Sequence, residues 1–441
     1  MWMRTILMAM MLVGTMSPGT THASASTVEA GAETWVVSTD LWGNPLYQSL
    51  ILTRDGERLG GTLDGDPITG TQTGSTVRFI TTDADQRVSV FEGTIAGETM
   101  SGNSDQADTH DAGKRAQHAF VARRIPARSG GPRRHVYTPT DYSNLFSPHR
   151  APVLTIWPGD SVQTTTIDSG GVDQYGNTRA LFGNPQTGPF HIATANAGDT
   201  LVVHIKRLRL NRDYADSLDS IVAPALSSSL AAQATELGKP VRWTLDHARG
   251  VARPTDASER LRDFEVPLRP MLGGLAVAPG FGWAALSTGD TGRYGGNMDF
   301  NEVIEGNTVY LPVGQPGALL YLGDAHALQG DGETSQYGLE TSMDVEFSVD
   351  VIHGRSISMP RIESPTHIMA LGQAGSLDAA LRIATAGLTE WLKQDYGLTL
   401  SETAQILGSS VEYAVVNLAG RSVGIAAKLK KERLQKLKRM D

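Results

Sequence analysis

Acidic residues and a histidine gather in glycine-rich segments on either side of the apolar run "GALLYL". Asp299 precedes this run, while Asp324, His326, Asp331 and Glu333 follow it. Asp-Gly and Gly-Asp pairs are common turn formers, so one interpretation is a set of ordinary β-turns. The other is the rim of a metal site, because glycine lets the backbone turn tightly and bring acids from separate strands together.

Asp324 and His326 are the residues whose spacing suggests chemistry most directly. On an extended segment, side chains two residues apart point to the same face. A carboxylate and an imidazole on one face make half of a divalent-cation site, which Asp299 and Asp168 would complete from other apparent strand ends. Zn²⁺ accepts both ligand types and suits amide hydrolysis, whereas Ca²⁺ would suit an all-carboxylate, structural site.

Several other chemistries are excluded by the sequence. The chain contains no cysteine, which removes thiol nucleophiles and thiolate metal sites. It also lacks a Gly-x-Ser-x-Gly elbow, a His-Glu-x-x-His motif and a phosphate-binding Gly-x-x-x-x-Gly-Lys loop. Any catalytic metal must therefore be held by oxygen and imidazole ligands.

The elements that must position these residues form a mainly β, α+β chain. Residues 33–124 alternate in short strands joined by Gly-Asn and Asp-Gly turns, which predicts a small lipocalin-like β-meander or barrel. Residues 125–141, rich in Arg, Pro and Gly, are interpreted as a linker. Residues 142–441 begin with strands and end with helices, as in an α+β domain.

Two capping patterns and one leucine pattern predict helices near the C-terminus. The first helix runs from a Ser376 cap to Gly397, and the second begins near Ser401. The basic tail, Lys428 to Arg439, has leucines at helical spacing and is expected to form a closing amphipathic helix. In the segment 213–245 a partly helical insertion is expected.

Composition and charge limit the partners. The chain has 441 residues and a net charge of −9, and it has no basic groove pattern, which argues against nucleic-acid binding. Residues 1–25 read as a signal peptide, with Arg4, a short apolar run and an Ala23-Ser24-Ala25 cleavage site. We therefore expect an exported protein, periplasmic or secreted, without a membrane span in its mature form.

Five ordered motifs resemble the acetamidase/formamidase family over roughly residues 142–420. They are "NPQTGPFHIATANAGDTLVVHI", "LRPMLGGLAVAP", "GGNMD", "YLPVGQPGALLYLGDAHALQGDGE" and "LETSMDV". The N-terminal β-domain lies outside this resemblance.

The resemblance implies an enzyme that hydrolyses short linear amides to a carboxylate and ammonia. It further implies a β-rich core with C-terminal helices, a homo-oligomer and a bound divalent metal, zinc or calcium. Motif by motif, the implied metal ligands are Asp168, Asp299, Asp324 and His326.

Catalytic roles under the same resemblance fall to three further residues. Glu340 and Glu333 are the candidates for a general base, and Asn297 is a candidate for binding the amide or the developing oxyanion. Two alternatives stay open. One is a non-catalytic binding or scaffold protein on the same fold, and the other is a hydrolase of a larger amide.

Overall fold

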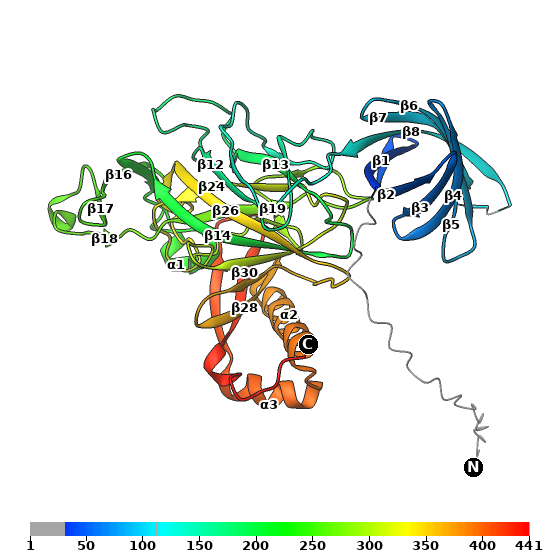
Figure 1. Cartoon of the computed structure of the whole chain (residues 1–441). Helices are drawn as coiled ribbons and strands as arrows, with labels where there is room; N and C mark the ends of the chain where they lie inside the picture. Colours follow the sequence, from blue (N-terminus) through cyan, green and yellow to red (C-terminus); the bar gives the residue numbers. More distant parts are fainter. Residues whose placement is uncertain (1–30, 109, 112, 441) are drawn as a thin grey trace, which may run out of the picture.

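The computed structural model describes residues 31–108, 110–111 and 113–440. The predicted signal peptide lies outside these residues. Within them, two β-rich parts are visible, a barrel on one side and a larger two-sheet domain on the other (Figure 1). No helix in this described part is long and apolar enough to cross a membrane.

The N-terminal part is a closed barrel of eight antiparallel strands in sequential order, which confirms the predicted β-meander or barrel. Its interior is filled by large apolar side chains, among them Trp35, Phe79, Phe91 and Phe120. The strands are β1 (Glu33–Leu41), β2 (Asn44–Asp55), β3 (Arg58–Leu63), β4 (Asp66–Thr73), β5 (Thr76–Thr82), β6 (Val88–Ala96), β7 (Thr99–Ala107) and β8 (Arg115–Ile125).

The segment interpreted as a linker takes part in the next sheet. Arg134–Val136 forms β9, which pairs in parallel with β12 at the edge of a nine-stranded sheet. In chain order the other strands of this sheet are β12 (Ser161–Thr166), β14 (Thr200–Leu210), β23 (Thr308–Pro312), β26 (Met343–Ile352), β27 (Arg361–Glu363), β28 (His367–Ala374), β29 (Glu412–Asn417) and β30 (Val423–Lys430).

An eleven-stranded sheet packs against it and carries Asp324, His326 and Glu340. Its strands are β11 (Leu154–Ile156), β13 (Gln186–Ile192), β15 (Tyr214–Leu218), β16 (Pro240–Asp246), β17 (Val251–Pro254), β18 (Val266–Pro267), β19 (Met271–Val277), β21 (Thr291–Gly292), β22 (Gly295–Asn297), β24 (Leu320–His326) and β25 (Glu340–Thr341). A further pair joins β10 (Leu145–Phe146) to β20 (Leu286–Ser287).

The main core lies between the two sheets. Strands β13, β19 and β24 are buried at every position, so they are central strands enclosed on both faces. Strand β26 alternates, with Met343, Val345, Phe347 and Val349 buried in this core. Central strands fix their side chains firmly, which matters because β24 carries Asp324 and His326.

Helices cover the C-terminal end of the nine-stranded sheet (Figure 1). Helix α2 (Leu377–Tyr396) begins at the predicted Ser376 cap and ends at Gly397 in the left-handed conformation. Helix α3 (Leu400–Ser410) is capped by Thr399 and Glu402 in a capping box, not by Ser401. Between β15 and β16 the 213–245 insertion contains a 3-10 turn, Ala223–Ala225, and one short α-helix, α1 (Ser228–Ala231).

The predicted tail helix is wrong. Its first residues belong to β30, which pairs with β28 along eight residues, and only a short 3-10 turn, Lys431–Arg433, follows. Leu429 and Leu434 are buried in the cluster under α2. The strand forms instead of the helix because pairing with β28 satisfies the backbone hydrogen-bonding groups. In the strand, Leu429 still reaches the core.

Candidate active site

The candidate site is built at the end of the central strand β24. Asp324 and His326 lie among the last three residues of β24. Glu340 on β25 pairs directly with His326 in the antiparallel ladder. Asp299 follows β22, and Glu333 lies in the loop between β24 and β25. These five residues are almost fully buried, with Glu333 the most exposed at 6%.

The five side chains form two overlapping groups with the spacing of metal ligands. One group consists of Asp299, His326 and Glu333, and the other of Asp324, His326 and Glu340. Within each group, the ligand atoms lie within 4.8 Å of one another. Within the second group, His326 Nε2 lies 3.0 Å from Glu340 Oε1 and 3.5 Å from Asp324 Oδ1. His326 is therefore the residue common to both groups.

Backbone strain accompanies this convergence. Asp299, Asp324 and Glu333 have φ values of 44°, 55° and 46°, and the neighbouring Asn184 has 58°. Left-handed conformations are unfavourable for residues other than glycine, and they cluster where function requires a particular side-chain direction. Four such residues in one cluster favour a functional site over a set of ordinary turns.

Amide side chains hold the carboxylates in place. Asn297 and Asn417 each donate to Asp299 Oδ2 at 2.5 Å, and Asn184 donates to Asn297 Oδ1 at 2.6 Å and to Asp324 Oδ2 at 3.2 Å. Both ends of the Asn297 amide are thus occupied within the protein. This arrangement favours a positioning role for Asn297 over the direct substrate contact that was predicted.

His326 is oriented from its other ring nitrogen. Its Nδ1 lies 2.8 Å from Gln329 Oε1, and Gln329 Nε2 donates to the Asp299 carbonyl at 2.6 Å. Sequence reasoning missed Gln329 and Asn417. Asn417 comes from β29, 118 residues after Asp299, so no local spacing could have indicated it.

Burial and crowding shift the pKa values of the cluster strongly. Burial, with Glu333 and Asp324 nearby, holds the pKa of Asp299 well above its usual range. Burial likewise raises the pKa of Glu333 to about 8, although the charge of His326 opposes this. Burial alone would lower the pKa of His326, but Glu340 and Asp324 raise it well above 6.5. Four buried carboxylates cannot all be charged around one imidazolium, so this cluster must hold protons or a cation.

The donor set fits a divalent cation. Asp299 Oδ1 and Glu340 Oε2 are buried and have no hydrogen-bond partner, and the contacts of His326 Nε2 with Glu340 Oε1 and Asp324 Oδ1 lack hydrogen-bond geometry although they are only 3.0 and 3.5 Å long. Within the described residues, no lysine or arginine pairs with the four carboxylates. Buried charges left without partners are costly, and three carboxylate oxygens plus an imidazole nitrogen are a ligand set that Zn²⁺ accepts.

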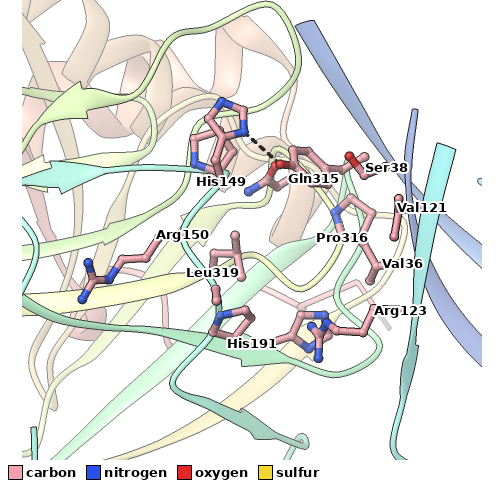
Figure 2. A pocket seen from close by; sticks show the side chains of 14 residues that line it. Val36, Ser38, Val121, Arg123, His149, Arg150, His191, Gln315, Pro316 and Leu319 are labelled. Carbon is pink, nitrogen blue, oxygen red and sulfur yellow. Dashed lines mark hydrogen bonds between the residues drawn. The ribbon is translucent and has the colours of Figure 1, made fainter. Parts of the chain in front are cut away.

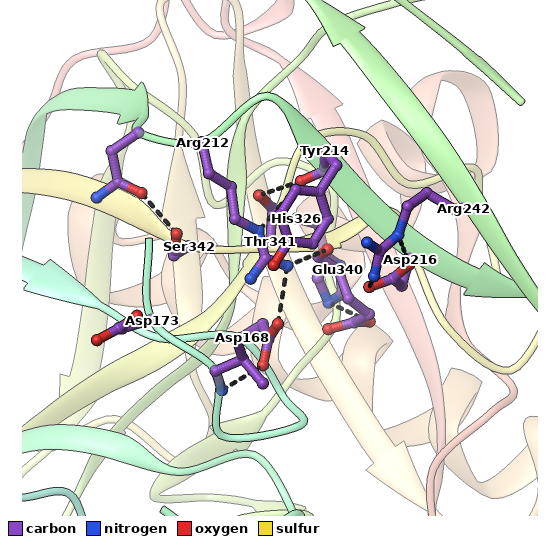
Figure 3. Close-up of polar contacts among 12 residues, drawn as sticks. Asp168, Asp173, Arg212, Tyr214, Asp216, Arg242, His326, Glu340, Thr341 and Ser342 are labelled. Atoms are coloured by element: carbon purple, nitrogen blue, oxygen red, sulfur yellow. Dashed lines mark hydrogen bonds and ion pairs between the residues drawn. The ribbon is translucent and has the colours of Figure 1, made fainter. Parts of the chain in front are cut away.

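Asp168, the fourth predicted ligand, lies outside both groups. Its Oδ2 forms a buried ion pair with Arg212 at 2.8 Å, and its Oδ1 accepts from the Val172 amide at 2.8 Å (Figure 3). Arg212 also donates to the Glu340 carbonyl at 3.2 Å. Asp168 therefore contacts the site indirectly. It pairs with Arg212, and Arg212 binds the backbone carbonyl of Glu340.

Asp331, noted with the other acids, also stays out of the cluster. It is exposed and accepts a hydrogen bond from Asn301 Nδ2 at 2.7 Å. For Asp331, the interpretation as a polar residue of an ordinary surface turn describes the structure well.

A cavity of about 440 Å³ opens onto the cluster. Its inner wall includes Asp299, Asp324, Glu333 and Glu340, so four carboxylates face the space. Phe182 and Tyr337 lie at its rim with ring centres 6.4 Å apart. The arrangement can bind a small polar molecule, orient it with oxygen groups and exchange protons with it.

The chain matches known proteins in this region. Residues 282–413, which contain all five cluster residues, match the model of the Acetamidase/Formamidase family. A 44-residue segment is 52% identical to a Schizosaccharomyces pombe protein named "Putative formamidase C869.04". This match spans about a tenth of each protein, 10% of this chain and 11% of the relative.

Solved structures extend the likeness to the whole larger domain. An acetamidase from Yersinia enterocolitica is 29% identical with a TM-score of 0.60, covering 69% of this chain and 94% of its own. A predicted acetamidase/formamidase from Thermoanaerobacter tengcongensis is 25% identical with a TM-score of 0.59, covering 70% and 99%. An acetamidase from Bacillus halodurans is 26% identical with a TM-score of 0.58, covering 68% and 99%. Residues 282–413 therefore match the acetamidase/formamidase family, and this chain shares the fold of these solved acetamidases.

Proposed function

We propose that the protein hydrolyses a linear amide to a carboxylate and ammonia at the Asp299–Asp324–His326–Glu333–Glu340 cluster. The observation that carries this proposal is a buried set of four carboxylates and one imidazole, with unpartnered ligand atoms, facing a cavity. The match of residues 282–413 to the Acetamidase/Formamidase family supports the same reaction class. A purely structural role would not require such a costly arrangement.

The residues that would hold a divalent metal are Asp299, Asp324, His326 and Glu340. When bound there, the metal would act as a Lewis acid toward the amide carbonyl. Zinc is favoured over calcium by the imidazole in the donor set. Asn184, Asn297 and Asn417 keep the carboxylates directed inward, so the site is organised before the substrate arrives.

Glu333 is the strongest candidate for the proton-transfer group. Its carboxyl lines the cavity, and burial raises its pKa to about 8, close to neutrality. As water adds to the carbonyl carbon, a carboxylate of this kind takes one proton from the water. When the C–N bond breaks, it returns that proton to the departing nitrogen, which leaves as ammonia.

The cavity also keeps a larger amide as a second candidate substrate. About 440 Å³ exceeds what formamide or acetamide fills, and Phe182 at the rim is 65% exposed. An amide with an apolar acyl group could place that group against Phe182 and Tyr337. A series of amides of increasing size therefore separates the two substrate classes.

We also propose that the chain is exported and assembles as a homo-oligomer. Export is supported by the charged, apolar and small-residue pattern of residues 1–25. N-terminal sequencing of the protein from its own cell would show a start at or near residue 26 if this is right. A start at Met1 would contradict export, and a monomer by light scattering would contradict assembly.

The decisive test measures ammonia release from formamide, acetamide, propionamide and benzamide, with metal content determined on the same sample. We expect activity that falls at least 100-fold after chelation and returns with Zn²⁺. His326→Ala should remove both metal and activity. His204 is a half-buried residue of β14 that contacts Asp350 and Thr308, away from the cluster, so His204→Ala should change neither. Full activity in metal-free protein would refute the metal, and metal-loaded protein that releases no ammonia would refute the reaction.

A further inference from the structure

A second cavity lies at the seam between the barrel and the larger domain, away from the carboxylate cluster. It has a volume of about 190 Å³ (Figure 2). The barrel contributes residues of β1, β2 and β8, and the larger domain contributes segments 148–152 and 315–319 together with His191 on β13. A hydrogen bond of 2.8 Å between Tyr47 and His149 Nδ1 closes the seam at one side.

His191 is the residue of this cavity that most needs an explanation. It is 3% exposed, and neither of its ring nitrogens has a hydrogen-bond partner. Burial, together with the charge of Arg123, lowers its pKa to about 3, so the ring is neutral and offers one donor and one acceptor. A Cβ on Gly317 would lie 2.2 Å from its ring, so the backbone is shaped closely around this histidine.

The other polar groups around His191 are mostly donors. Arg123 extends from β8 toward His191 (Figure 2), and no ion pair of Arg123 is found among the described residues. Gln315 Nε2 is buried and has no hydrogen-bond partner. The lining contains no aspartate or glutamate, and of its two arginines Arg150 is paired with Asp141 at 2.6 Å, so Arg123 is the cation left without an acidic partner. One uncompensated cation beside free donors is a pattern that recognises an anion.

The remaining walls are apolar. They consist of Val36, Val121, Pro148, Pro152, Pro316 and Leu319. An inorganic anion such as phosphate would leave these groups facing an ion, which is unfavourable for both. A molecule with one anionic end and a short apolar body satisfies the donors and the apolar walls together.

We propose that this seam binds a small monocarboxylate, with its carboxylate at Arg123 and His191 and its apolar body against Pro316, Leu319 and Val121. The volume suits a body of a few carbon atoms. Because the lining comes from both domains, the bound molecule would join the barrel to the larger domain. The proposal does not depend on amide hydrolysis at the other site.

The test is calorimetric titration of the full mature chain with butyrate and benzoate, with inorganic phosphate and 1-butanol as probes that each lack one half of the ligand. We expect the carboxylates to bind at least 10-fold more tightly than phosphate or 1-butanol. Arg123→Gln should weaken this binding at least 10-fold. Arg115→Gln, on the same strand but paired with Asp105, should leave it unchanged.

Arg123→Gln also separates this site from the carboxylate cluster. A carboxylate that bound at the cluster as a reaction product would not respond to Arg123. Unchanged affinity in Arg123→Gln would therefore refute the seam site, as would equal affinity for phosphate or no binding by folded protein. His191→Phe, which removes both ring nitrogens, should weaken binding in the same direction.

Discussion

At the scale of single residues, the site combines buried charge with backbone strain. Asp299, Asp324 and Glu333 adopt left-handed conformations, and their carboxyl groups are nearly sealed from solvent. Neither feature stabilises the fold, so packing elsewhere must compensate for both. The asparagine amides reduce the electrostatic cost, since Asn297 and Asn417 both donate to Asp299. This organisation makes the site sensitive to changes in its packing neighbours.

Gly273 is such a neighbour. A Cβ at this position would lie 2.5 Å from both Asp299 Oδ1 and Asp324 Oδ2. We predict that Gly273→Ala pushes the two carboxylates apart and lowers amide turnover at least 100-fold while the protein stays folded. Turnover and metal content are the measurements. Gly375→Ala, where a Cβ meets nothing within 4 Å, is the matched control, and equal activity in the two variants would contradict the prediction.

Asp168 and Arg212 should behave as a pair rather than as catalytic residues. Removing one charge from a buried ion pair strands the other and costs about 3–5 kcal/mol, whereas replacing both costs less. We therefore predict that Asp168→Asn lowers the free energy of unfolding by about that amount. The double variant Asp168→Asn/Arg212→Met should recover much of the stability. It should not recover the turnover, because the hydrogen bond from Arg212 to the Glu340 carbonyl is lost.

Urea unfolding followed by tryptophan fluorescence, together with kcat and KM, checks this prediction. An Asp168→Asn variant as stable as the parent would contradict the structural role. A double variant with full activity would contradict the positioning of Glu340.

The sequence could indicate only part of this constellation. Asp324 and His326 are two residues apart, so the period of a strand predicts that they share a face, and the structure brings them to 3.5 Å. Asn184, in the loop before β13, and Asn417, at the end of β29, reach the same cluster from distant parts of the chain. Their contacts depend on sheet order, which a single sequence does not specify.

At the scale of elements, the sequence predicts structure correctly where the deciding contacts are between near neighbours in the chain. The Ser376 and Gly397 caps predict α2 correctly because capping is a contact between near neighbours. The tail was assigned wrongly as a helix, because its leucines fit a helical period while the pairing of β30 with β28 is non-local. Short apolar patterns are ambiguous until a strand partner is known.

Two glycines near the C-terminal helices should respond in opposite ways to the same substitution. At Gly372 on β28 a Cβ would lie 2.0 Å from the Ala380 carbonyl oxygen, so Gly372→Ala must displace α2 and should cost about 1–3 kcal/mol. Gly408 lies inside α3 with open space around it. Gly408→Ala should therefore stabilise the protein by about 0.5–1 kcal/mol.

Thermal and urea unfolding of both variants measure these effects. A Gly372→Ala variant as stable as the parent would show that the sheet–helix contact at Gly372 does not limit the packing of α2, and a destabilised Gly408→Ala variant would contradict the helix-propensity argument.

At the scale of the whole molecule, three distant segments meet at one carboxylate. Asp395 on α2 accepts hydrogen bonds from Arg439 at 2.6 Å and from Trp391 Nε1 at 3.1 Å, and it also pairs with Arg355. The Met440 amide donates to the Asp395 carbonyl at 2.7 Å. This residue joins the end of the chain and the segment after β26 to the helix that covers the sheet.

The electrostatics of Asp395 predict a particular pH dependence. Burial alone would raise its pKa, but hydrogen bonds from Arg439 and Arg355 outweigh burial and hold the pKa below 3.8. A carboxyl whose pKa is lower in the folded state stabilises the fold above its unfolded pKa, and this contribution is lost as the pH falls through the folded value. Asp395→Asn should therefore cost about 1–3 kcal/mol at pH 7, and this difference should shrink as the pH falls below the unfolded pKa toward the folded one.

Urea unfolding of the parent and Asp395→Asn proteins at pH 7, 5 and 3, with Trp391 as the nearby fluorophore, measures this dependence. Asp350→Asn is the control, because Asp350 is exposed and pairs only with His204. If the Asp395→Asn difference is as large at pH 3 as at pH 7, packing rather than charge explains it. If the stability difference between the parent and Asp395→Asn proteins shrinks at low pH, and Arg439→Gln causes part of the same loss, charge interactions bind the C-terminal segment to α2.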